Sequence, residues 1–178
     1  MGNLMAAEYL SLDGVMEDPK WTAPYWSKDI AKLQHELLFA SDALLLGRIT
    51  YEGMAKSWPE MKDEEGFAER INSLPKHVAS STLKELEWNA QLINGDVAEA
   101  VKQLKQEEGQ NLLIYGSSVL IQSLMAHGLI DEYRLMVHPV VLGAGKKLFE
   151  GNEAKLELTN TTVTNSGVVV LTYKSEEV

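Results

Sequence analysis

Residues 115–118 are the first candidates for chemistry in this chain. The apolar run Leu112–Tyr115 is too short for a helix and indicates a strand buried on both faces. Gly116 ends that strand, and Ser117 or Ser118 can cap the helix that follows. Such a turn offers backbone N–H groups and a positive helix end, where α/β proteins hold phosphates. The same pattern also fits a turn that binds nothing.

The order strand, glycine, helix occurs a second time, earlier in the chain. Residues 43–46 predict a short buried strand, Gly47 ends it, and Arg48 and Thr50 lie in the first turn of the next predicted helix. A guanidinium and a hydroxyl form a good phosphate-binding pair. Arg48 could equally bridge surface carboxylates, because the chain has 26 Asp and Glu against 16 Lys and Arg.

Three consecutive hydroxyl residues, Ser80, Ser81 and Thr82, end and follow a third predicted strand over residues 75–80. They can hydrogen-bond a phosphate or a ribose, and they are also common loop residues. Asp29 lies in the first turn of a helix that Ser27 can cap. A carboxylate there either stabilises the helix dipole or faces a substrate. The four histidines lie on different predicted elements without ligand-like pairing, so no metal site is expected.

The elements that would position these residues alternate between strand and helix. This order predicts an α/β fold, a mostly parallel sheet with helices on both faces and an antiparallel C-terminal hairpin. Residues 15–24 contain two prolines and no period, which indicates an irregular loop. The predicted strands are 4–12, 43–46, 75–80, 88–93, 112–115, 130–137, 156–163 and 168–173, and the helices are 27–40, from 48 to about 57, 67–74, 97–107 and 118–125.

Composition narrows the function classes. At 178 residues, 45% hydrophobic and 24% charged, the chain is expected to form one domain, residues 1–178. The net charge of −10 argues against a nucleic-acid partner, whose binding surface is basic. The chain has no cysteine, and it lacks a signal-like start and a run long enough to span a bilayer. We therefore expect a cytoplasmic protein with a small-molecule ligand and no membrane contact.

Five segments, in this order, resemble the dihydrofolate reductase-like family: 11–14 (SLDG), 44–52 (LLLGRITYE), 75–83 (PKHVASSTL), 115–120 (YGSSVL) and 131–149 (DEYRLMVHPVVLGAGKKLF). Within that family the chain is more similar to the reductase domain of the bifunctional riboflavin-biosynthesis deaminase-reductase. The resemblance covers nearly the whole chain. It implies a three-layer α/β/α fold around a mixed, mostly parallel sheet.

The resemblance also implies NADPH as the cofactor. Dihydrofolate reductases carry a glycine pair joined by a cis peptide bond at the third cofactor segment, where this chain has Tyr115 and Gly116. The implied residues are Gly47, Arg48 and Thr50 for the phosphates and the nicotinamide-side ribose, Ser80, Ser81 and Thr82 for the adenosine 2′-phosphate, and Tyr115, Gly116, Ser117 and Ser118 for the pyrophosphate.

For the substrate half, the resemblance implies Asp13 as a catalytic and substrate-binding residue. Asp29 is a second catalytic candidate, and Tyr51, Gly145 and Lys146 are substrate-binding candidates. Hydride transfer needs little acid–base machinery from the protein. The expected function is an NADPH-dependent reductase of a pterin-like or pyrimidine-like molecule, resembling 5-amino-6-(5-phosphoribosylamino)uracil reductase. The alternatives are a non-catalytic NADP(H)-binding protein of the same fold and a dihydrofolate reductase.

A homodimer is the last expectation. Residues 130–137, the hairpin 156–173 and the apolar turn 139–142 are predicted at the antiparallel edge of the sheet. That edge carries more apolar surface than a monomer leaves in water. The riboflavin-type reductases that the chain resembles also dimerise, and a symmetric pair would cover the edge.

Overall fold

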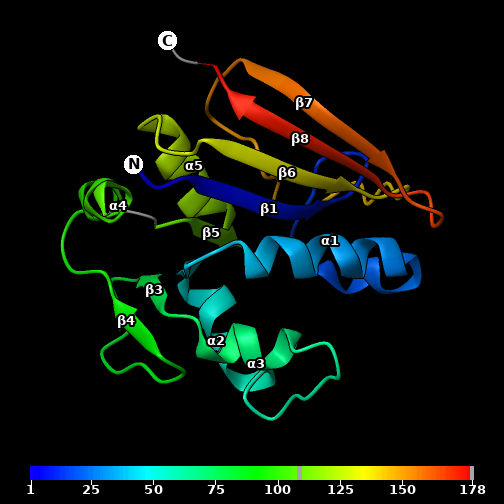
Figure 1. Cartoon of the computed structure of the whole chain (residues 1–178). Coiled ribbons are helices and arrows are strands. Elements are labelled where there is room, and N and C mark those ends of the chain that lie inside the picture. The colour runs from blue at the N-terminus through cyan, green and yellow to red at the C-terminus, as the bar shows by residue number, and fades with distance from the viewer. Residues whose placement is uncertain (108–109, 177–178) are drawn as a thin grey trace.

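The computed structural model describes residues 1–107 and 110–176, and its centre is an eight-stranded sheet in the order β4-β3-β2-β5-β1-β6-β8-β7 (Figure 1). The first six strands run parallel, and β8 and β7 are antiparallel to their neighbours. This confirms the predicted mixed sheet. The strands are β1 (Leu4–Leu10), β2 (Ala43–Gly47), β3 (Lys76–Ala79), β4 (Ala90–Leu92), β5 (Leu112–Tyr115), β6 (Glu132–Val137), β7 (Leu156–Val163) and β8 (Val169–Ser175).

Helices cover both faces of the sheet, as the alternating pattern predicts. Figure 1 shows α1, α2 and α3 together along one side of the sheet. Among the helices that the structure describes, none is both long and apolar enough to cross a membrane. The helices are α1 (Lys28–Phe39), α2 (Arg48–Ser57), α3 (Phe67–Ser73), α4 (Val97–Gln106) and α5 (Ser118–Ala126), with a short 3-10 helix η1 (Pro19–Tyr25) before α1.

The central strands are buried because each is apolar on both faces. All five residues of β2 are buried, and successive side chains alternate between two cores. Leu44 and Leu46 pack on the α1, α2 and α3 side, whereas Ala43 and Leu45 pack on the side of α4 and α5. The helices begin where the sequence predicts: Ser27 caps α1 and Asp96 caps α4 through side-chain oxygens.

One expectation about local structure is wrong. Residues 19–25 form η1 rather than an irregular loop, since a proline fits the first position of a short 3-10 helix and Pro24 lies near its end. Residues 132–137 form β6 between β1 and β8. Tyr133, Leu135 and Met136 are buried there, whereas Glu132, Arg134 and Val137 are partly exposed.

Candidate functional site

A cleft of about 2030 Å³ opens at the carboxyl ends of the parallel strands. Strand β5 lies between β1 and β2, so the direction of strand addition reverses there. In open α/β sheets, ligands bind outside the carboxyl ends of strands at such a reversal. The register brings the strand ends together: Ala7 of β1 lies opposite Tyr115 of β5, and Gly47 of β2 opposite Ala79 of β3.

All ten residues expected to bind the cofactor line this cleft. They come from three turns that follow β2, β3 and β5, and the parallel sheet brings these turns to one edge. The ten residues are Gly47, Arg48, Thr50, Ser80, Ser81, Thr82, Tyr115, Gly116, Ser117 and Ser118.

The turns after β2 and β5 interlock. A Cβ on Gly47 would collide with the Ser117 side chain, and a Cβ on Gly116 would collide with Thr50. Gly116 also has φ +66°, in the left-handed region that favours glycine. In the structure, therefore, both glycines are needed for close contact between the two turns. The Thr50 side chain occupies the space that a side chain at position 116 would need.

The N-termini of α2 and α5, which follow these turns, differ in capping. Ser117 Oγ accepts a hydrogen bond from Leu120 N at 3.3 Å, whereas Gly47 gives α2 no side-chain cap. The first N–H groups of a helix have no intrahelical acceptor and attract anions. The peptide bond between Tyr115 and Gly116 is trans, like every bond within the described residues.

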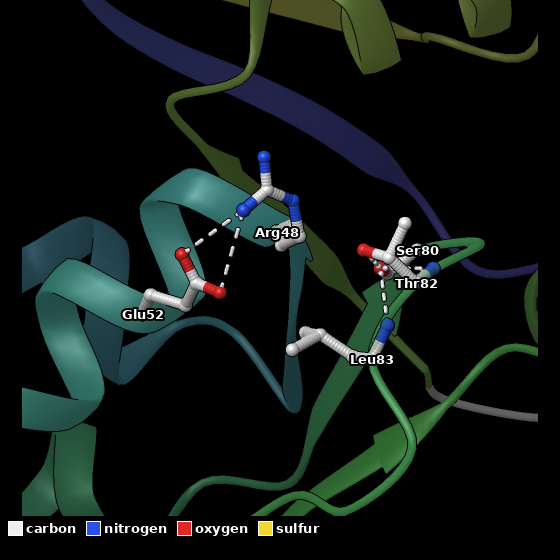
Figure 2. A network of polar contacts seen from close by, with 5 residues as sticks. All are labelled: Arg48, Glu52, Ser80, Thr82 and Leu83. Atoms are coloured by element: carbon white, nitrogen blue, oxygen red, sulfur yellow. Dashed lines mark hydrogen bonds and ion pairs between the residues drawn. The ribbon is translucent and has the colours of Figure 1, made fainter.

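Arg48 lies at the start of α2, with Glu52 on one side and the loop after β3 on the other (Figure 2). Its Nη1 is 3.3 Å from Glu52 Oε2, and both side chains are about half exposed. Ser80 Oγ accepts from the N–H groups of Thr82 and Leu83, which fixes the loop beside Arg48. The exposed ion pair is worth little, so Arg48 can turn from Glu52 to an anion in the cleft.

Asp13 holds two loops together instead of facing the cleft. Its carboxylate accepts hydrogen bonds from Ser11 Oγ at 2.6 Å, Gly143 N at 2.8 Å and Leu142 N at 3.1 Å. The Ser11 hydroxyl and these two N–H groups lower the pKa of Asp13 to about 2. The SLDG turn is thereby tied to the loop after β6.

The other substrate-binding and catalytic candidates do not gather at one place in the structure. Asp13, Asp29 and Tyr51 are absent from the described residues that line the cleft. Tyr51 is buried, and its hydroxyl accepts from Glu87 N at 2.7 Å. Gly145 borders a separate hollow of about 420 Å³. Lys146 does line the main cleft, and its backbone N–H is held by Glu17.

Three residues of the cleft wall, Glu8, Tyr9 and Gln34, were not expected from the sequence, and the hydrogen bond of the Tyr115 side chain to Gln34 was not expected either. Gln34 is 5% exposed, donates to the Tyr9 hydroxyl at 2.8 Å and accepts from the Tyr115 hydroxyl at 3.3 Å. Burial raises the pKa of both phenols, so both hydroxyls stay protonated. This wall therefore carries uncharged hydrogen-bonding groups.

Glu8 is the buried acid of the cleft. It is 4% exposed, and its Oε2 accepts the Gly116 N–H at 3.1 Å. Burial raises the pKa of Glu8 well above its ordinary value, and the Gly116 N–H only partly opposes this shift. The sequence held a signal for this residue: Glu8 interrupts a strand whose neighbours on both faces are apolar.

Known proteins are similar to this chain over most of its length. The chain is 32% identical to the uncharacterized protein YyaP of Bacillus subtilis (strain 168) over 169 residues, which cover 92% of this chain and 90% of YyaP.

Solved structures share the fold. A Shewanella sp. PV-4 protein whose name assigns it to riboflavin biosynthesis has a TM-score of 0.75 at 22% identity, covering 98% of this chain and 99% of its own. The Thermotoga maritima diaminohydroxyphosphoribosylaminopyrimidine deaminase/5-amino-6-(5-phosphoribosylamino)uracil reductase scores 0.68 at 15% identity, covering 98% of this chain and 56% of its own. Enterococcus faecalis dihydrofolate reductase, complexed with NADP(H), scores 0.67 at 18% identity, covering 99% and 98%.

The fold is therefore dihydrofolate reductase-like, as the sequence resemblance implies. The sequence model described as the RibD C-terminal domain matches residues 3–171, almost the whole chain. This protein belongs to the RibD C-terminal domain family.

Proposed function

We propose that this protein is an NADPH-dependent reductase of a small pyrimidine-like or pterin-like molecule. The observation that carries the proposal is the cleft itself, which collects all ten residues expected to bind the cofactor from three separate turns. Membership of the RibD C-terminal domain family supports an oxidoreductase.

The residues at the β2 and β3 end of the cleft fit a phosphorylated dinucleotide. Arg48 supplies a half-exposed guanidinium, and the hydroxyls of Ser81 and Thr82 lie on the adjoining loop. Since the chain has a net charge of −10, such a local cation is needed to hold an anionic ligand. A 2′-phosphate beside Arg48 would distinguish NADPH from NADH.

The opposite wall fits an uncharged ring better than a folate. From α1, the buried polar side chain in the cleft is Gln34, an amide, while Asp29 is exposed at the helix start and outside the cleft lining. An amide and two phenols can hydrogen-bond the carbonyl and N–H groups of a pyrimidine-like ring. This arrangement favours a pyrimidine-type substrate over dihydrofolate.

NADPH, when bound, supplies a hydride. The chain would contribute binding and orientation: Arg48 and the helix starts would hold the phosphates, and the Tyr9, Gln34 and Tyr115 chain would hold the substrate ring. Apolar residues of the cleft, Trp26 and Met16 among them, would exclude water from the reacting atoms.

The cofactor assignment is tested by calorimetric titration of NADPH and NADH into wild type and two variants. We expect tighter binding of NADPH. Arg48→Ala should weaken NADPH binding by about 1.5 kcal/mol, the low end for a charge-assisted hydrogen bond, because the guanidinium is half exposed. Glu52→Gln should strengthen it, since it removes the carboxylate that competes for Arg48.

Lys102→Ala is the matched control, because Lys102 is 49% exposed and paired with Glu99 along α4. It should leave both affinities unchanged. Equal affinities for NADPH and NADH in the wild type would contradict the proposal.

Turnover separates the reductase from a non-catalytic binding protein of the same fold. Protein and NADPH are offered the ribosylaminopyrimidine phosphate intermediate, dihydrofolate or a panel of carbonyl compounds, and the nicotinamide absorbance is followed. Tight NADPH binding without oxidation of NADPH by any compound would favour the binding protein.

A further inference from the structure

Glu8 lies in the cleft beside the Gly116 turn and next to Tyr9 in the chain. It belongs to β1, next to the turn that follows β5, and it lines the cleft although it is 4% exposed. Its neighbours along the same face of β1, Ala6 and Leu10, belong to the apolar core under α4 and α5. Within the described residues, Glu8 forms no ion pair.

The two carboxyl oxygens of Glu8 have different surroundings. Oε2 accepts the Gly116 N–H at 3.1 Å, whereas Oε1 has no hydrogen-bond partner among the described residues. A buried polar atom without a partner destabilises the folded protein. Such an atom in a native protein calls for an explanation, and a ligand group in the adjoining cleft is one.

The protonation state of Glu8 indicates which partner Oε1 needs. Burial raises the pKa of Glu8 well above its ordinary value, which favours the neutral acid. Oε2 already accepts a hydrogen bond from Gly116, so the proton belongs on Oε1. A protonated Oε1 is a donor, and its partner must be an acceptor such as a carbonyl oxygen.

Strand spacing separates Glu8 from Arg48 and Ser80, although Glu8 adjoins the Gly116 turn expected at the pyrophosphate. In the order β3-β2-β5-β1, Arg48 follows β2 and Ser80 follows β3. Neighbouring strands lie about 4.8 Å apart, so β1 is roughly 10 Å from β2 and roughly 14 Å from β3. A dinucleotide with its 2′-phosphate at Ser80 and its pyrophosphate between Arg48 and the Gly116 turn would extend its uncharged nicotinamide end toward β1.

We propose that Glu8 is a ligand-binding residue of the cleft, which donates a hydrogen bond from Oε1 to the carboxamide oxygen at the nicotinamide end of the dinucleotide. Oε2 meanwhile holds the Gly116 turn. This assignment rests on the proposed function, and it adds a side chain that contacts the uncharged end of the cofactor.

The test compares two ligands on three proteins by calorimetry. The ligands are NADP+ and 2′,5′-ADP, which lacks the nicotinamide half. Glu8→Gln keeps an acceptor for Gly116 and a donor for the ligand, so both affinities should stay within about threefold of wild type. Glu8→Met removes both groups and should weaken NADP+ about tenfold or more while leaving 2′,5′-ADP nearly unchanged. Circular dichroism confirms that each variant is folded.

A spectroscopic measurement on the wild type does not depend on the Met variant folding. In protein labelled with carbon-13 at the Glu side-chain carboxyl, the Glu8 signal is identified by its absence in Glu8→Gln. We expect it to move on addition of NADP+ and to stay in place with 2′,5′-ADP.

The outcomes separate this inference from the proposed function. If wild type binds neither ligand, the proposed function fails and the inference fails with it. If wild type binds both and the Glu8 signal does not respond to NADP+, only the inference is overturned. Equal weakening of both ligands by Glu8→Met would also overturn it, because Glu8 would then act only by holding the Gly116 turn.

Discussion

Two carboxylates, five residues apart, show how the surroundings of a side chain decide its chemistry. Asp13 accepts three hydrogen bonds, so its anion is stabilised and its pKa falls to about 2. Glu8 is buried and accepts only one hydrogen bond, so its neutral acid is favoured. Asp13 therefore holds the two loops together, whereas Glu8 is a buried carboxyl group in the cleft with one oxygen that the described residues leave free to bind a ligand.

The raised pKa of Glu8 predicts a stability that falls with pH. The ordinary pKa of 4.5 applies to the unfolded chain, while the folded chain keeps the proton to higher pH. Above about pH 4.5 the unfolded state binds fewer protons, so each increase in pH favours unfolding until Glu8 ionises in the folded protein. Glu8→Gln removes this effect. The free energy of unfolding of the variant relative to wild type should increase by about 1.4 kcal/mol per pH unit across this window.

Urea unfolding of both proteins between about pH 5 and about pH 8 measures that difference. Asp29→Asn is the control, because Asp29 is exposed in the first turn of α1. The difference in free energy of unfolding between Asp29→Asn and wild type should not show the pH dependence expected for Glu8→Gln. Parallel wild-type and Glu8→Gln curves would show that Glu8 ionises normally in the folded protein.

At the scale of elements, the site depends on two strand, glycine, helix units that interlock. Gly47 contacts Ser117 and Gly116 contacts Thr50, so each unit fixes the position of the other. The hydroxyl residues of both turns are thereby presented to the same cleft. A glycine in one unit is needed because of a side chain in the other.

This packing predicts strong coupling between Gly116 and Thr50. Gly116→Ala should destabilise the protein by about 2 to 5 kcal/mol, since it combines left-handed strain with a collision against Thr50. Thr50→Ala in the same chain removes the colliding atoms and should restore about 1 to 3 kcal/mol. Thermal or urea unfolding of the single and double variants gives the coupling energy.

Gly128→Ala isolates the strain, because Gly128 has φ +65° with open space around it. It should cost only about 1 to 2 kcal/mol. If Gly116→Ala and Gly128→Ala cost the same, and Thr50→Ala restores nothing, the two turns are not coupled through this contact.

Local patterns in the sequence predict most of these elements and their caps. Apolar runs followed by glycine locate β2 and β5, and Ser27 and Asp96 mark helix starts. Family resemblance adds the cofactor segments, which the cleft then brings together. The collision between Gly116 and Thr50 could not be predicted, because it depends on contacts between residues 66 positions apart in the chain.

The substrate half was less predictable for a related reason. Gln34 occupies an apolar helix stripe between Ile30 and Leu38, four residues from each, and Glu8 interrupts an apolar strand. Polar residues in such positions indicate burial with a partner. Which partner they meet, and whether the space beside them is a cleft, depends on how α1 packs against β1 and β5.

At the scale of the whole molecule, β7 is the edge strand beyond β8. It is eight residues long and mostly exposed, with Leu158 50% and Val163 71% accessible. It contains no proline and one charged residue, Glu157, and one register irregularity between Leu158 and Asn160 interrupts its pairing with β8, so its edge is only lightly protected against pairing with another strand. The burial of β6 removes that strand from the expected interface and leaves β7, with the exposed Val141 in the loop after β6.

The homodimer stays a prediction, and β7 is its most specific site. Two copies related by a two-fold axis would pair β7 with β7 in antiparallel register, which satisfies the free N–H and C=O groups of both edges.

Light scattering of the wild-type protein should give about twice the chain mass of 19.8 kDa. A charge at Leu158 or Val163 would be buried without a partner in such a pair, so Leu158→Lys and Val163→Lys should give monomers. Gln103→Lys, which adds the same charge to an exposed position of α4, should stay dimeric. A wild-type mass near 19.8 kDa would refute the dimer, and dimeric Lys variants would move the interface away from β7.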